Sequence, residues 1–201
     1  MKRALGKAAV CNLLIVSVIF GLAVPVGRAQ VSPAKKDKEV EKKELELETA
    51  KIELEKKKLE LEQAKKDLQA QETAGRLTMR LQGDVLFDFG KSDLRPEAKT
   101  ALEKVAVVLS QFPESDISIR GYTDAKGPPG ANLALSEKRA AAVKRWMVKE
   151  KAIPEAKLTT EGLGEKDPLA PNKNADESDN PEGRQQNRRV EITVEKLPYA
   201  Q

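Results

Sequence analysis

Apolar residues follow two different patterns in the first 74 positions of the chain. A mainly apolar run extends over residues 8–26, whereas the apolar side chains of residues 34–74 are spaced among Lys, Glu and Gln. The second segment contains neither Gly nor Pro, a composition that predicts one long helix. At about 1.5 Å per residue this helix would be a rod about 60 Å long, enough to act as a spacer.

The predicted helix carries two columns of apolar side chains. One column recurs at every seventh position: Val40, Leu47, Leu54, Leu61 and Leu68. The other lies about 140 to 160° around the helix: Leu45, Ile52 and Leu59. Heptad spacing can form a coiled-coil seam, but one dimer interface cannot bury both columns. Two interpretations stay open, namely a homo-oligomer formed through residues 34–74 or a solvated single-helix spacer with Glu–Lys pairs.

From Leu77 onward the pattern alternates between strand and helix periods. Apolar residues alternate with polar ones in five segments, which we predict to be strands: residues 77–81, 84–89, 116–122, 158–164 and 189–195. Two helices intervene. The first opens near Pro96 and has an apolar face: Leu102, Val105, Ala106, Leu109 and Phe112. The second carries another: Leu133, Ala140, Val143 and Met147.

The order strand, helix, strand, helix, strand, strand predicts an α/β fold, a two-layer sandwich with a mixed sheet, preceded by the long helix. Residues 165–186 are polar, contain three prolines and show no regular pattern. We therefore expect them to form an irregular, mobile loop on the surface.

The first 29 residues resemble a leader. Lys2, Arg3 and Lys7 precede the apolar run, and the small-residue pattern Gly27-Arg28-Ala29 follows it. This layout predicts a secretory signal peptide cleaved after Ala29. An uncleaved anchor is the alternative, because the run is just long enough to cross a bilayer. The expected organisation is a signal peptide (1–29), a charged helical spacer (30–75), an α/β domain (76–197) and a tail (198–201).

Charge and residue usage exclude several functions. The formal charge of +4 is carried by four basic residues of the leader, so the remaining chain is balanced and offers no basic patch for nucleic acid. The chain has no His, and its single cysteine, Cys11, lies in the leader. Cys11 also precedes most of the apolar run, which argues against lipidation. We therefore expect no enzyme activity, no cofactor, no metal site and no disulfide.

One constellation suggests ligand binding. Asp124 follows the predicted strand 116–122, and Arg139 lies in the next helix on the same face as Asn132 and Ser136. An aspartate and an arginine brought together in this way suit a ligand with an ammonium and a carboxylate on one carbon. An internal Asp124–Arg139 salt bridge that stiffens the loop is the alternative interpretation.

These residues belong to a series of motifs that resembles the OmpA-like peptidoglycan-binding domain family. The motifs occur in the family's order: FDFGKSDLRPEA from Phe87, IRGYTDAKG from Ile119, NLALSEKRAAAV from Asn132, GLGEKDP from Gly162 and NRRVEI from Asn187. The resemblance covers about residues 81–195 and does not extend to the long helix. Two departures are Tyr122, where many members have histidine, and the longer loop 165–186.

The resemblance implies non-covalent binding of peptidoglycan through the diaminopimelate of its stem peptide. It assigns the principal ligand contacts to Asp124 and Arg139. Further positions line the same pocket in the family: Asn132, Asn187, Arg188 and, with Gly90, Asp88.

The implied location is the periplasm or cell envelope of a Gram-negative bacterium, at the peptidoglycan and near the outer membrane. Membrane association would require an uncleaved leader or a partner. The implied role is to anchor or space envelope components. The alternative is that the helix is the main functional element, as an oligomerising or partner-docking module, and that wall binding only localises it.

Overall fold

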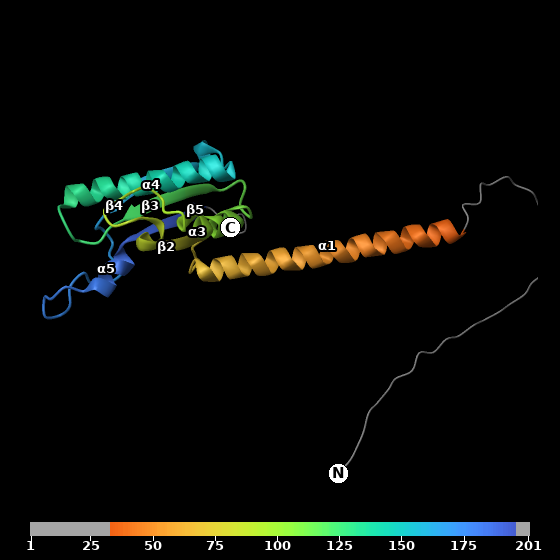
Figure 1. The fold of residues 1–201 in the computed structure, drawn as a ribbon, viewed down its shortest axis with the longest axis horizontal. Helices are drawn as coiled ribbons and strands as arrows, with labels where there is room; N and C mark the ends of the chain where they lie inside the picture. The colour runs from red at the N-terminus through yellow and green to blue at the C-terminus, as the bar shows by residue number, and fades with distance from the viewer. Residues whose placement is uncertain (1–32, 196–201) are drawn as a thin grey trace, which may run out of the picture. The chain divides into compact units, whose positions relative to one another are not determined.

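The computed structural model describes residues 33–195 (Figure 1). The predicted signal peptide and the tail 198–201 lie outside the described residues. The chain divides into two compact units within its first helix, between Leu47 and Glu48. The described part of the first unit is helical throughout, and the second unit contains the sheet.

Helix α1 (Pro33–Asp67) confirms the long predicted helix but ends before residue 74. Gln69 adopts a left-handed conformation with φ 48°, which stops a right-handed helix. Residues Gln71–Thr73 then form strand β1, which pairs antiparallel with the next strand after a turn at Ala74 and Gly75. The helix prediction for residues 68–74 is wrong because composition alone does not reveal this turn.

Five strands form one mixed sheet in the order β1-β2-β5-β3-β4. The four longer strands have these bounds: β2 Arg76–Gln82, β3 Asp116–Tyr122, β4 Leu158–Gly164 and β5 Arg189–Glu195. Strands β3 and β4 pair in parallel, and the other neighbours pair antiparallel. The mixed sheet predicted from the element order is therefore confirmed.

Helices α3 (Ala98–Leu109) and α4 (Pro129–Lys151) pack with one face of the sheet, because their buried side chains join the same apolar cluster as the inward strand residues. Fully buried members of this core include Met79, Ile119, Ile192, Leu102 and Met147. Alternate strand residues form polar pairs, as expected for the other face of a sheet: Thr78 with Thr193, Arg80 with Glu191, and Arg120 with Glu161. The two-layer α/β prediction is thus confirmed.

The end of α1 contributes to this core. Ala64 and Leu68 are buried, Leu61 packs against the cluster, and Asp67 forms an ion pair with Lys104 of α3. The last two leucines of the first heptad column therefore pack within the domain. Leu54 of the same column remains 56% exposed.

Three expectations for the domain are wrong. Residues 84–89 do not form a strand, because Gly83 N donates to Arg188 O at 2.7 Å and the chain turns into a short helix, α2 (Gly83–Leu86). Leu133, expected to point inward, is 40% exposed. The loop that begins at Glu165 is not irregular throughout, because helix α5 (Pro181–Asn187) forms its last part.

Candidate functional site

Asp124 lies directly beyond strand β3 and is 5% exposed. The backbone of the preceding residue is fixed, since Thr123 N donates to Gly164 O at 2.7 Å. The Asp124 carboxylate accepts hydrogen bonds from Lys126 N at 3.0 Å on Oδ1 and from Arg188 Nη1 at 2.8 Å on Oδ2. Arg184 Nη1 approaches the same Oδ2 at 3.5 Å.

Arg139 extends from α4 and is also 5% exposed. Its Nε donates to Lys91 O at 3.0 Å, and its guanidinium lies 5.0 Å from the centre of the Phe87 ring. Within residues 33–195 it forms no salt bridge to a carboxylate. The pKa of Arg139 is lowered, first by burial and also by the nearby Arg188 guanidinium, against the opposite effect of the Asp84 and Asp124 carboxylates. Since an arginine stays protonated in proteins, this site holds a buried cation that a ligand anion can neutralise.

The internal Asp124–Arg139 salt bridge that sequence reasoning left open is not formed. Arg188 takes that place, because its Nη1 binds Asp124 while its Nε and Nη2 bind the Asp84 carboxylate at 2.9 and 2.7 Å. Arg139 is thereby left available for another anion.

The other candidate residues divide into two groups. Asn132 lies against the site: its Nδ2 donates to Asp124 O at 3.2 Å and to Glu165 Oε2 at 3.1 Å. The backbone of Asp88 also contacts the site, since Arg139 Nη2 donates to Asp88 O at 3.5 Å. The Asp88 side chain is exposed and binds Lys91 Nζ at 3.1 Å.

Asn187 is placed differently. Its Oδ1 accepts from Leu169 N at 2.7 Å and from Ala170 N at 3.1 Å, and its Nδ2 donates to Ala170 O and to Asn172 Oδ1. With its donors and acceptor directed at the loop, this side chain fixes the loop 165–186 beside the site. Ser136 likewise has a structural position, because its Oγ accepts from Gly164 N at 2.9 Å.

Sequence reasoning missed two residues of the site, Asp84 and Arg184. Hydrogen bonds from Arg188 hold the pKa of Asp84 below its ordinary value, so Asp84 is an anion at neutral pH. Arg184 binds Asp179 through its Nε at 2.7 Å as well as approaching Asp124. The sequence predicts a strand around Asp84 and an irregular loop around Arg184. Neither predicted element indicates that these side chains reach the site.

Hollows flank this network. One has a volume of about 380 Å³ and is lined by Asp84, Phe87, Asp88, Phe89, Arg95, Pro181, Arg184 and Arg188. A second, of about 540 Å³, includes Gly90, Lys91 and Asn132 in its lining. Neither is lined by Asp124 or Arg139 themselves. A ligand in the first hollow would meet the arginines that hold Asp124 and the aromatic ring under Arg139.

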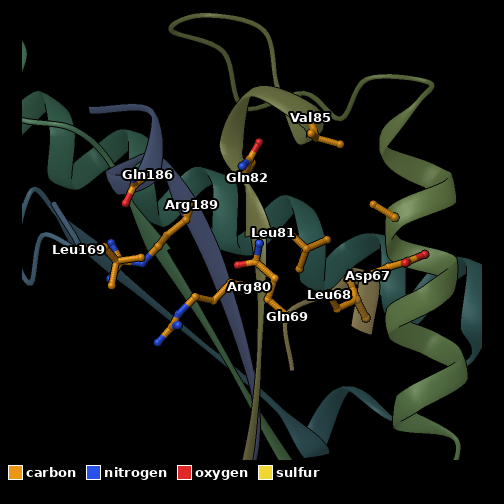
Figure 2. Close-up of a pocket in the computed structure, with 11 residues that line it drawn as sticks. Asp67, Leu68, Gln69, Arg80, Leu81, Gln82, Val85, Leu169, Gln186 and Arg189 are labelled. Carbon is orange, nitrogen blue, oxygen red and sulfur yellow. The ribbon is translucent and has the colours of Figure 1, made fainter. Parts of the chain in front are cut away.

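Another cavity, of about 700 Å³, lies beside the end of α1 and strand β2 (Figure 2). Its two arginines, Arg80 and Arg189, both bind the Glu191 carboxylate, and Arg189 also lies 3.6 Å from the centre of the Tyr122 ring. These cations are already paired, so the cavity lacks the free charge found at Arg139.

Within the described range, no three or more His, Cys, Asp or Glu side chains are grouped to hold a metal ion. Of the helices described there, none has the length and apolarity needed to span a membrane.

Comparisons with known proteins match parts of this chain to a family and to several relatives. Residues 86–182 match the model of the OmpA family. The chain is 43% identical over 126 residues to photosystem I P700 chlorophyll a apoprotein A2 of Gloeobacter violaceus, covering 63% of this chain and 14% of that protein. The curated relatives include several outer-membrane proteins, and the chain spans about half of their length or less.

Two solved structures resemble the domain. A putative MotB-like protein from Desulfovibrio vulgaris matches with 33% identity and a TM-score of 0.55, covering 63% of this chain and 77% of that one. The cell wall anchor of the T6SS from Pseudomonas aeruginosa matches with 27% identity and a TM-score of 0.53, covering 62% and 85%. The sheet, its helices and these matches define a two-layer α/β domain of the type found in the MotB-like protein. The chain belongs to the OmpA family.

Proposed function

We propose that the domain binds peptidoglycan non-covalently through the diaminopimelate residue of the stem peptide. The observation that carries this proposal is a buried arginine, Arg139, without a carboxylate partner and close to the buried carboxylate of Asp124. The end of the diaminopimelate side chain carries an ammonium and a carboxylate on one carbon. The carboxylate would pair with Arg139 and the ammonium would bind Asp124.

The comparisons support the same class of ligand. The similar P. aeruginosa structure is that of the cell wall anchor of the T6SS, and several curated relatives are outer-membrane proteins. We propose that this protein is exported by its leader, residues 1–29, and anchors or spaces envelope components at the peptidoglycan. Residues 76–197 would supply the wall contact and residues 30–75 the spacer, although α1 packs its last turns within the domain.

Co-sedimentation with isolated sacculi tests the proposal. We expect the purified protein to pellet with sacculi whose stem peptides contain diaminopimelate. Sacculi with lysine at that position are the matched control, since lysine keeps the ammonium but lacks the carboxylate for Arg139. We expect retention to fall about tenfold or more, as for a lost charge-assisted pair. Equal retention on both, or none on either, would overturn the assignment.

A second candidate function is self-association through α1. Outside the turns that pack in the domain, its apolar side chains are exposed: Leu45 by 65%, Ile52 by 64% and Leu59 by 65%. These three belong to one column, and a second copy of the same helix could bury them by knobs-into-holes packing. We propose this column as the interface of a homo-oligomer.

Sedimentation velocity would measure this association. We expect the wild type to form an oligomer at micromolar concentration and the triple variant Leu45→Gln, Ile52→Gln, Leu59→Gln to be monomeric. Glu46→Gln, Glu53→Gln, Glu60→Gln is the matched control, because these positions follow the same spacing about 100° around the helix. A monomeric wild type would favour the solvated spacer instead.

A further inference from the structure

Oδ2 of the Asp124 carboxylate already receives two arginine donors. Oδ1 accepts from Lys126 N, and Oδ2 is shared by Arg188 and Arg184. A ligand ammonium has three donors in a compact group, and it needs an open position on this carboxylate. An ammonium that approaches Oδ2 from the side of the arginines therefore competes with one of these cations.

The two arginines are not equally easy to displace. Arg188 binds Asp124 at 2.8 Å and is fixed from its other side by two hydrogen bonds to Asp84. Arg184 is at 3.5 Å from Asp124, and its closer partner is the Asp179 carboxylate, which it contacts through Nε and Nη2. If Arg184 withdrew, it would still pair with Asp179, and Asp124 would still pair with Arg188. Neither charge would be left unpaired, so the withdrawal costs little.

The position of Arg184 in the fold also favours its displacement over that of Arg188. Arg184 and Arg188 line the hollow of about 380 Å³, whereas Asp124 behind them does not. Arg184 belongs to α5, the helix at the end of the long loop, and Asp179 precedes that helix. The loop therefore contributes a cation to the site instead of only covering it.

We propose that Arg184 is a displaceable counter-ion for Asp124 and a specificity-determining residue of the binding site. A ligand cation takes the place of Arg184, which then pairs with Asp179 alone. A ligand without an ammonium gains nothing from this exchange, because Asp124 would lose a partner without receiving another. The site thereby selects zwitterionic ligands over simple carboxylates. This inference rests on the proposed function and concerns the regulation of the same site.

Calorimetric titration with free meso-diaminopimelate tests it on the whole protein. Arg184→Gln removes the competitor, so we expect Kd to fall about three- to tenfold, the scale of one partly exposed charge pair. Asp179→Asn removes the alternative partner of Arg184 and strengthens its hold on Asp124, so Kd should rise by a similar factor. In the double variant the effect of Asp179→Asn should vanish, because the competing cation is gone.

N,N′-Diacetyl-diaminopimelate is the ligand control, since with both amines acylated it carries no ammonium that could displace a cation. With it, Arg184→Gln should give no gain in affinity. If the wild type binds diaminopimelate but Arg184→Gln binds equally or more weakly, with an unchanged melting temperature, the counter-ion role is overturned. If the wild type does not bind at all, the proposed function itself fails, and the two failures are thereby distinguished.

Discussion

Replacement of Arg139 by alanine is expected to abolish retention on sacculi with little loss of folding stability. The guanidinium has no carboxylate partner in the described part of the chain, so its removal leaves no protein anion unpaired. The ligand carboxylate would instead be left without its counter-ion in a buried site. We expect a loss of about 1.5 to 3 kcal/mol of binding free energy, or about ten- to 150-fold in Kd.

Calorimetry with diaminopimelate and thermal unfolding measure the two quantities separately. Lys149→Ala is the matched control, because Lys149 is also a cation of α4 but is exposed and lines neither hollow beside the site. It should bind as the wild type does. A variant Arg139→Ala that unfolds several degrees lower while binding normally would identify a structural arginine, held there by Lys91 O and Phe87, and would remove it from the site.

Asp124 gives a less selective test for a physical reason. Its carboxylate neutralises Arg188, which is itself largely buried, so Asp124→Ala leaves that cation with Asp84 alone. Loss of stability and loss of binding are then both expected. The sequence leaves both a structural and a binding role open for this pair. The variant of Arg139 therefore distinguishes the two roles better than the variant of Asp124.

The sequence predicts the domain's regular elements well where the apolar period is unambiguous. Strands β2, β3, β4 and β5, the inward face of α3 and, apart from Leu133, that of α4 follow from alternation and helical spacing. The prediction is wrong at residues 84–89, where alternation is also present. There a long-range contact decides, because Gly83 bonds to Arg188 O, a residue more than a hundred positions away.

The same limit applies to the site. Their placement after a strand and on one helix face singles out Asp124 and Arg139 but leaves an internal salt bridge open, and only the family resemblance assigns them to a ligand. Asp84 and Arg184 reach Asp124 or its partner from α2 and α5, across 104 and 60 positions of sequence. No local periodicity encodes such a network, since it forms only when β3, β5 and the loop are assembled.

Gly121→Ala is expected to have the largest effect on folding. An added Cβ at this position of β3 would lie 2.2 Å from the backbone oxygen of Ser136 in α4, a distance that requires the helix or the strand to move. Gly162, the partner of Gly121 in the parallel register, would contact the same turn of α4. These two glycines let the helix approach the sheet closely. We expect a loss of about 3 kcal/mol, measured by urea unfolding.

Gly130→Ala is the control, because nothing lies within 4 Å of its added Cβ and alanine favours a helix by up to about 1 kcal/mol. It should be as stable as the wild type or slightly more so. If Gly121→Ala proved equally stable, α4 must be able to move away from β3. Arg139 lies one turn beyond Ser136 on the same helix, so such a movement should displace the guanidinium and weaken diaminopimelate binding. Unchanged stability together with unchanged binding would contradict the close packing of α4 on which the site's geometry depends.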